Sequence, residues 1–140
     1  MPIVQEIQQP TKELVIQEVA KVFFNLLALY AFGSRVQGTA NAPSDLDLAV
    51  LVEGYADPMH LFELSNQLAD QLGYEVDLLD MRAASTIMQY QILTTGERWW
   101  VKDPLPVGLF ETMVLSEKTN LDEARVGLLA DIQARGRVYG

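Results

Sequence analysis

Two aspartates, Asp45 and Asp47, stand two residues apart in a segment where apolar residues alternate with other side chains. In a β-strand that spacing puts both carboxylates on one face, a few ångströms apart. Like charges held so close repel each other unless a cation lies between them, and a hard divalent cation such as Mg²⁺ prefers oxygen ligands. The pair therefore indicates a metal site, with an exposed polar strand face as the plainer alternative.

A Gly-Ser pair precedes these aspartates. Gly33 and Ser34 follow the uncharged segment Leu26–Phe32, which has the composition of a buried strand. A junction of strand, Gly-Ser and helix start offers backbone N–H groups, a hydroxyl and the positive end of a helix dipole to a phosphate. Gly38 lets the backbone approach closely, and Ser44 adds a hydroxyl beside the first aspartate. Gly33 alone would be an ordinary strand terminator, but here a phosphate-binding loop would precede a carboxylate pair.

Asp77 is a third carboxylate, in the middle of the predicted strand over residues 75–80. A charged residue in a strand interior is disfavoured unless that face of the sheet is solvated or functional. If the two strands are neighbours, Asp77 can face Asp45 and Asp47. Three carboxylates can then hold two metal ions that clamp the attacking and leaving oxygens of a phosphoryl displacement.

The elements that must position these residues alternate between helices and strands, which predicts an α/β protein with one central sheet. We expect helices over residues 11–23, 58–72 and 83–95, a turn of helix near 34–40, and strands over 26–32, 45–52, 75–80 and 97–102. From about Leu105 onward the apolar spacing predicts a helical tail, with Gly127 and the Thr119-Asn120 pair as candidate breaks between two helices. The direction of the strands does not follow from this pattern.

The composition limits the class of protein. The chain has 140 residues, a net charge of −9 and no cysteine, which favours one domain, residues 1–140, with a catalytic core over 1–102 and a helical tail over 103–140. The acidic balance argues against binding a nucleic-acid duplex, and the missing cysteines exclude disulfides and thiolate chemistry. The first residues do not resemble a signal peptide, and no apolar stretch is long enough to span a membrane, so we expect a cytoplasmic protein.

The segment GSRVQGTANAPSDLDLAV, followed by VDLLD, resembles the signature of the minimal nucleotidyltransferase family of the DNA polymerase β superfamily. More closely it is similar to the antitoxin half of the HEPN–MNT toxin–antitoxin pairs. The likeness covers nearly the whole chain, including GERWW, LDEAR and the terminal RGRVYG. It implies the DNA polymerase β-like nucleotidyltransferase fold, with a central mixed sheet flanked by helices and a helical C-terminal tail.

The resemblance also implies roles for the residues. Gly33 and Ser34 would hold the β- and γ-phosphates of an NTP, with ATP as the donor; Asp45 and Asp47 would ligate two Mg²⁺ ions; Asp77 would ligate the catalytic metal and help to deprotonate the acceptor hydroxyl. Many relatives carry an arginine just before the glycine that corresponds to Gly38. Here that residue is Gln37, for which Arg35 could substitute.

The implied function is an antitoxin that transfers AMP from ATP to a tyrosine hydroxyl of a cognate HEPN toxin, an RNase in this family, and so neutralises it in a hetero-oligomer. Transfer to a small molecule, as in aminoglycoside nucleotidyltransferases, and a non-catalytic antitoxin that only binds the toxin are the alternatives. The chain has little sequence with which to build its own acceptor pocket, so a partner protein is expected to form part of that pocket. The short, acidic chain argues against a template-dependent polymerase, which must hold a primer–template duplex.

The predicted tail carries apolar residues on more than one face of any single helix. Contiguous apolar patches left exposed usually mark interfaces, so we expect the tail to contact a partner protein. The alternative is a tail that folds back as two helices and completes the core. The apolar residues concerned are Leu109, Phe110, Met113, Val114, Leu121, Leu128 and Leu129.

Five other residues invite a functional interpretation that the sequence does not favour. His60 has no second histidine with which to bind a metal, so surface or packing roles are expected. At least one of Trp99 and Trp100 is expected in the core or an interface. Asp80 is expected to cap a helix rather than bind metal, while Arg82 could either approach a phosphate or lie solvated at a helix start.

Overall fold

The sheet contains four strands in the described part of the chain: β1 (Leu26–Phe32), β2 (Leu46–Val52), β3 (Val76–Asp80) and β4 (Glu97–Val101). They appear in a computed structural model that describes residues 9–33 and 45–135, with the side chains of residues 11–33 and 45–128. The strand order is β3-β2-β1-β4. Strand β1 runs antiparallel to β2 and β4, whereas β2 and β3 are parallel. The sheet is therefore mixed, as the family resemblance implied.

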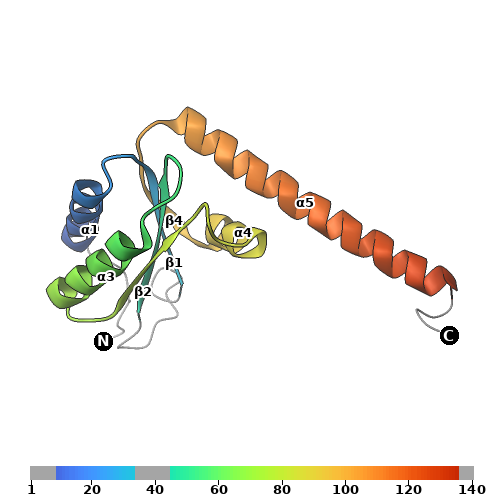
Figure 1. The fold of residues 1–140 in the computed structure, drawn as a ribbon, viewed down its shortest axis with the longest axis horizontal. Helices are drawn as coiled ribbons and strands as arrows, with labels where there is room; N and C mark the ends of the chain where they lie inside the picture. The colour runs from blue at the N-terminus through green and yellow to red at the C-terminus, as the bar shows by residue number, and fades with distance from the viewer. Residues whose placement is uncertain (1–8, 34–44, 136–140) are drawn as a thin grey trace.

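The helices cover both faces of the sheet (Figure 1). α1 (Gln9–Val22) and α3 (Pro58–Leu72) lie on one face, and α4 (Thr86–Thr95) and α5 (Pro104–Arg135) on the other. The first layer buries Val15, Val19, Leu64 and Leu68, among others, against the sheet. The second layer buries Ile92, Val107, Phe110 and Val114.

The side chains of β2 alternate between these two layers. Leu46, Leu48 and Val50 pack with α1 and α3, whereas Ala49 and Leu51 pack with α4 and α5. Because successive side chains of a strand point to opposite faces, Asp47 belongs to the face of α4 and α5. The predicted alternation of this strand is confirmed.

Helix α3 links the two parallel strands and begins and ends where the sequence predicts. Asp57 caps it by accepting a 2.8 Å hydrogen bond from the backbone N–H of Met59, and Pro58 occupies the first turn. At the other end Gly73 has φ +83° and donates its N–H to the carbonyl of Ala69, a left-handed cap that glycine adopts without strain.

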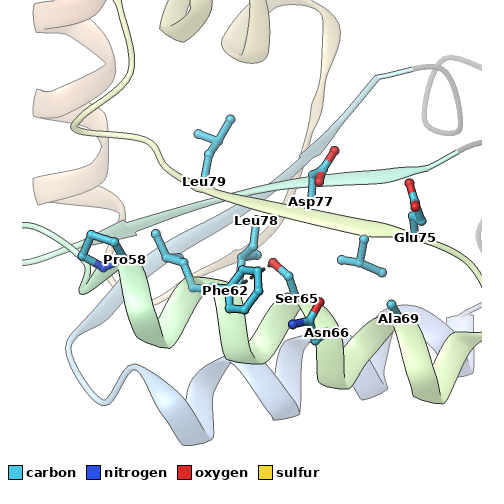
Figure 2. Close-up of a pocket in the computed structure, with 11 residues that line it drawn as sticks. Pro58, Phe62, Ser65, Asn66, Ala69, Glu75, Asp77, Leu78 and Leu79 are labelled. Atoms are coloured by element: carbon cyan, nitrogen blue, oxygen red, sulfur yellow. Dashed lines mark hydrogen bonds between the residues drawn. The ribbon is translucent and has the colours of Figure 1, made fainter.

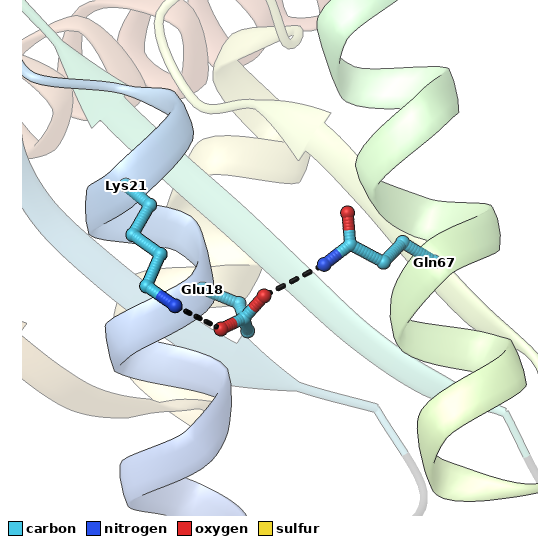
Figure 3. Close-up of polar contacts among 3 residues, drawn as sticks. All are labelled: Glu18, Lys21 and Gln67. Carbon is cyan, nitrogen blue, oxygen red and sulfur yellow. Dashed lines mark hydrogen bonds and ion pairs between the residues drawn. The ribbon is translucent and has the colours of Figure 1, made fainter.

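A polar contact joins α1 to α3 at the surface (Figure 3). The carboxylate of Glu18 accepts hydrogen bonds from Lys21, at 3.0 Å, and from the side-chain amide of Gln67, at 2.6 Å. Exposed pairs of this kind contribute little to stability. The apolar contacts beneath them hold the two helices on the sheet.

Three predicted helices differ from those in the structure. Helix α1 spans Gln9–Val22 rather than 11–23, and Pro10 falls in its first turn, where proline is tolerated. Helix α4 begins at Thr86 rather than at 83, because the hydroxyl of Ser85 caps it by accepting from the N–H of Met88. Helix α5 is continuous from Pro104 to Arg135 and does not break at Gly127 or at the Thr119-Asn120 pair. A glycine inside a helix costs only about 1 kcal/mol, and a 2.7 Å ion pair between Lys118 and Asp122 spans the other candidate break.

Helix α5 has a packed half and a projecting half. Val107, Phe110 and Val114 are buried, whereas Leu121 and Leu128 are 41% and 61% exposed. Figure 1 shows the helix leaving the body of the molecule. The alternative of a tail that folds back as two helices is therefore wrong, although the first turns do complete the core. None of the helices in the described residues combines the length and apolarity needed to cross a bilayer.

Candidate active site

The parallel pairing of β2 and β3 brings two of the predicted site residues together. Asp47 and Asp77 are direct partners in the register of these strands. Asp45 comes just before β2 and two residues before Asp47. On the other side of β2, Asp47 is the register partner of Phe32, the last residue of β1. Asp47 therefore lies between Asp77 and the end of β1, where the predicted phosphate loop begins.

The pKa of Asp47 is raised by burial and by these neighbours. Partial burial, followed by the charges of Asp77 and Asp45, raises the pKa of Asp47 from its usual 3.8 to about 6. A group with this environment favours either a proton or a metal ion over free ionisation.

The carboxylates of Asp45, Asp47 and Asp77 offer oxygen ligands only, which fits a hard divalent cation such as Mg²⁺. Across the residues that the structure describes, no three acidic or histidine side chains are already gathered closely enough to enclose a metal ion. Carboxylates repel each other and gather closely only around positive charge. Phosphate oxygens of a nucleotide commonly complete such a coordination shell.

Gly33 is needed at its position for two independent reasons. Its φ is +84°, in the left-handed region that other residues rarely adopt. In addition, a Cβ atom at Gly33 would collide with the carboxylate oxygen Oδ2 of Asp47. The motif glycine and the predicted metal ligand are thus in close contact.

Four of the predicted nucleotide-binding residues lie outside the described residues: Ser34, Arg35, Gly38 and Ser44. Gln37 and the turn of helix expected near 34–40 lie there too. Their contacts with phosphate stay predictions.

A groove of about 530 Å³ runs between α3 and β3, with Asp77 in its wall. Figure 2 shows Asp77 and Leu79 rising on one side of β3, whereas Leu78 points toward α3, from which Phe62 and Ser65 project. The sequence pattern did not predict this groove. One signal was available in the sequence, because Phe62 is a large apolar residue that lies off the leucine stripe of α3. In the structure its side chain is 64% exposed.

Asp80 and Arg82 hold the end of β3 together. The buried carboxylate of Asp80 accepts hydrogen bonds from the N–H groups of Ala56, at 2.9 Å, and Arg82, at 3.0 Å. The prediction that Asp80 caps a helix is wrong, because Asp57 and Ser85 cap the neighbouring helices α3 and α4. The guanidinium of Arg82 donates to the carbonyls of Gly54 and Val52 and covers the ring of Phe110. It is therefore engaged in the fold rather than solvated or directed at a phosphate.

The histidine and the tryptophans also have structural roles, as expected. His60 is exposed on α3 and meets the ring of Phe23 edge-on. Trp99 and Trp100 pack against the same core cluster although they are adjacent in the chain. A bulge explains this, since Leu29 pairs with Trp100 and the next residue of β1 pairs with Arg98, which leaves Trp99 as the extra residue.

Residues 15–104 match the protein family described as polymerase beta, nucleotidyltransferase. That span contains Gly33, Asp45, Asp47 and Asp77, and it covers more than half of the chain. The chain belongs to this nucleotidyltransferase family. The fold and the family that the sequence resemblance implied are thereby confirmed.

The similarity of this nucleotidyltransferase to known proteins extends beyond that span. It is 33% identical to the protein adenylyltransferase MntA of Shewanella oneidensis over 127 residues, 91% of each chain. A crystal structure of a toxin–antitoxin with AMP-PNP superposes with a TM-score of 0.76 at 32% identity, over 87% of this chain and 98% of that one. A structure of tri-AMPylated S. oneidensis HEPN toxin in complex with MNT antitoxin gives 0.73 at 29% identity, over 91% and 99%.

Proposed function

We propose that this nucleotidyltransferase is an antitoxin that transfers AMP from ATP to a tyrosine hydroxyl of a HEPN toxin and so neutralises it. The observation that carries the proposal is the register of Asp47 and Asp77 beside Gly33, in a chain similar to MntA along 91% of its length. A similar chain has been crystallised with AMP-PNP, and another with an AMPylated toxin. A cytoplasmic location, where ATP is available, is part of the proposal.

The proposed roles rest on the family resemblance and, for Gly33, Asp47 and Asp77, also on their positions in the fold. Asp45, Asp47 and Asp77 would hold two Mg²⁺ ions, which would neutralise the triphosphate and stabilise the leaving oxygen. The backbone at Gly33 and the residues Ser34, Arg35, Gly38 and Ser44 would bind the phosphates. In the transfer, the tyrosine oxygen attacks the α-phosphorus, the bond to the β-phosphate oxygen breaks, and pyrophosphate leaves. Asp77 orients the tyrosine hydroxyl and accepts its proton.

The division of the chain follows from the same proposal. Residues 1–102 would form the catalytic core, while residues 103–140 would complete it with their first turns and reach the toxin with the rest. The net charge of −9 suits a basic protein surface and disfavours a nucleic-acid duplex.

The test is to incubate the protein with Mg²⁺, ATP and the HEPN protein encoded beside it, and to weigh all products intact. The toxin should gain the mass of one or more adenylates. Asp77→Asn should lower turnover far more than ATP affinity, because its carboxylate acts on the attacking hydroxyl. Asp70→Asn, the same change at an exposed site on α3, is the matched control.

The other outcomes separate the alternatives. Neutralisation of the toxin without a change in its mass would show that the protein acts as a non-catalytic antitoxin that only binds the toxin. Adenylate found only on an added aminoglycoside would point to a small-molecule acceptor. An unchanged turnover in Asp77→Asn would remove that residue from the catalytic role.

A further inference from the structure

The outer edge of β3 has backbone groups that no strand of the described residues pairs with. Strand β3 ends the sheet, next to β2. The N–H of Leu46 donates to the carbonyl of Glu75, and the N–H of Met81 donates to the carbonyl of Val50. In a parallel ladder the residues that face the neighbouring strand alternate. The odd-numbered residues of β3 therefore face β2, and Leu78 turns its N–H and carbonyl outward.

The surface along this edge is hollowed and more apolar than polar. Besides the groove beside α3 (Figure 2), a second hollow of about 690 Å³ lies at the end of β3 and shares Leu61 and Leu79 with it. Tyr55 and Met88 line the second hollow and are partly exposed, as Phe62 is in the first. Apolar surface of this extent beside an unpaired strand is typical of a site for an extended peptide.

The position of Asp77 indicates which peptide belongs there. On a strand added to the edge, side chains alternate between the two faces of the sheet, and a residue opposite Asp77 points to the same face as its carboxylate. The added strand would thus deliver one side chain to the candidate active site. Glu75 and Asp77, both exposed at this end, favour a basic side chain near the delivered residue.

We propose that the outer edge of β3 binds the acceptor segment of the toxin as an added β-strand. The acceptor tyrosine lies beside Asp77, and an apolar side chain of the same segment fills the hollow lined by Tyr55 and Met88. This inference rests on the proposed function and deepens it, because it assigns the surface that selects the tyrosine to be modified.

The first test compares two exposed phenylalanines. Phe62→Ser removes an apolar side chain from the groove, and Phe24→Ser makes the same change at a residue that is 90% exposed and lines neither hollow. With the HEPN protein as substrate, the KM for the toxin should rise about tenfold in Phe62→Ser, the loss typical of a contributing interface residue. Phe24→Ser should behave as the wild type. The affinity for ATP, measured by calorimetry, should be the same in all three proteins.

The second test concerns the backbone. Leu78→Pro removes an N–H that faces away from β2, so pairing within the sheet survives while pairing with an added strand is lost. Thermal unfolding checks that the variant folds. In the wild type with the HEPN protein bound, hydrogen exchange at the Leu78 amide should slow markedly, whereas the Asp77 amide, which already faces β2, should change little.

The outcomes distinguish this inference from the proposed function. If the wild type adenylates the toxin but Phe62→Ser and Leu78→Pro keep their KM within roughly twofold of it, the docking edge is wrong and the function stands. Equal losses in Phe62→Ser and Phe24→Ser, or an unprotected Leu78 amide in the complex, would overturn it as well. If the wild type transfers no AMP to the toxin, both proposals fall.

Discussion

At the scale of single residues, the ionised form of Asp47 is destabilised by burial and by the neighbouring carboxylates. Its pKa of about 6 lies above the usual 3.8, so the folded protein holds a proton that the unfolded chain releases. The free energy of unfolding should therefore decrease as the pH rises from about 4 to about 6, and stay low above that window. The effect reverses the usual behaviour of a salt-bridged aspartate.

Asp47→Asn should remove this destabilisation. At pH 7 and without metal, the variant should be more stable than the wild type by about 1 kcal/mol, since solvent at the half-exposed site reduces the full effect of the shift. At pH 4 the two proteins should unfold alike. Urea unfolding at both pH values measures the difference, and an advantage that is the same at both would contradict the electrostatic explanation.

Gly33→Ala tests the contact between the motif glycine and the metal ligand. The added methyl group needs space that the Asp47 carboxylate occupies, and the backbone φ of +84° disfavours any side chain. We expect a loss of about 1–3 kcal/mol in stability and a large loss of ATP–Mg²⁺ affinity by calorimetry.

Gly108→Ala is the matched control for that change. Gly108 lies in α5, where an added methyl group would meet only open space, so alanine there should be neutral or stabilise the helix by up to about 1 kcal/mol. If Gly33→Ala bound ATP as tightly as Gly108→Ala does, Gly33 would have no part in the nucleotide site.

At the scale of elements, one polar network fixes α5 to the sheet. The hydroxyl of Tyr30 in β1 donates to Glu111 Oε2 at 2.7 Å, and Arg98 in β4 donates to Glu111 Oε1 at 3.0 Å. Burial, the hydrogen bond to Glu111 and its charge all raise the pKa of Tyr30 well above its usual range. The tyrosine therefore stays protonated and serves as a donor.

Glu111→Ala should release this attachment. It leaves the buried Tyr30 hydroxyl without its acceptor, which costs about 1–3 kcal/mol. Glu117→Ala, on the exposed surface of the same helix, should cost much less, because its 3.2 Å contact with Thr86 is solvated. Thermal unfolding of the two variants gives the comparison, and equal losses would show that the network contributes nothing particular.

Most elements could be predicted because their signals are local. β1 has the predicted bounds, and the Asp57 and Gly73 caps of α3 have the predicted chemistry. The interruption of α5 was predicted wrongly, because a glycine or asparagine weakens a helix by an amount that neighbouring contacts easily offset.

Features that depend on distant partners could not be predicted from the sequence. The face of Asp77 followed from its spacing, but its register with Asp47 depends on which strands are neighbours. The Tyr30–Glu111 contact joins residues that are 81 positions apart. The groove beside β3 needed both the strand order and the packing of α3.

At the scale of the whole molecule, the stripe of α5 that completes the core continues beyond it. Val107, Val114, Leu121 and Leu128 recur every seven residues, a spacing that keeps them near one face of the helix. The first two are buried and the last two are exposed. The continuation of a core stripe into solvent supports a partner-binding role for the projecting part.

A chain truncated after residue 118 should separate the two roles. The last described contacts between α5 and the body are the Glu117–Thr86 hydrogen bond and Lys118 over the ring of Tyr90, so the truncated protein should melt within a few degrees of the full chain. It should bind ATP normally and bind the HEPN protein more weakly, by light scattering. A truncated protein that bound the toxin as tightly as the full chain would exclude residues 119–140 from the interface.

The projecting half of α5 also sets how the free protein melts. Isolated helices of roughly 15 residues are marginal in water, and the residues of α5 from 119 to 128 are exposed. Far-ultraviolet circular dichroism should therefore lose part of its helical signal before the fluorescence of the core-packed Trp99 and Trp100 changes. The free chain is then not a two-state system, and a single melting temperature would average two cooperative units, of which only the second is the catalytic domain.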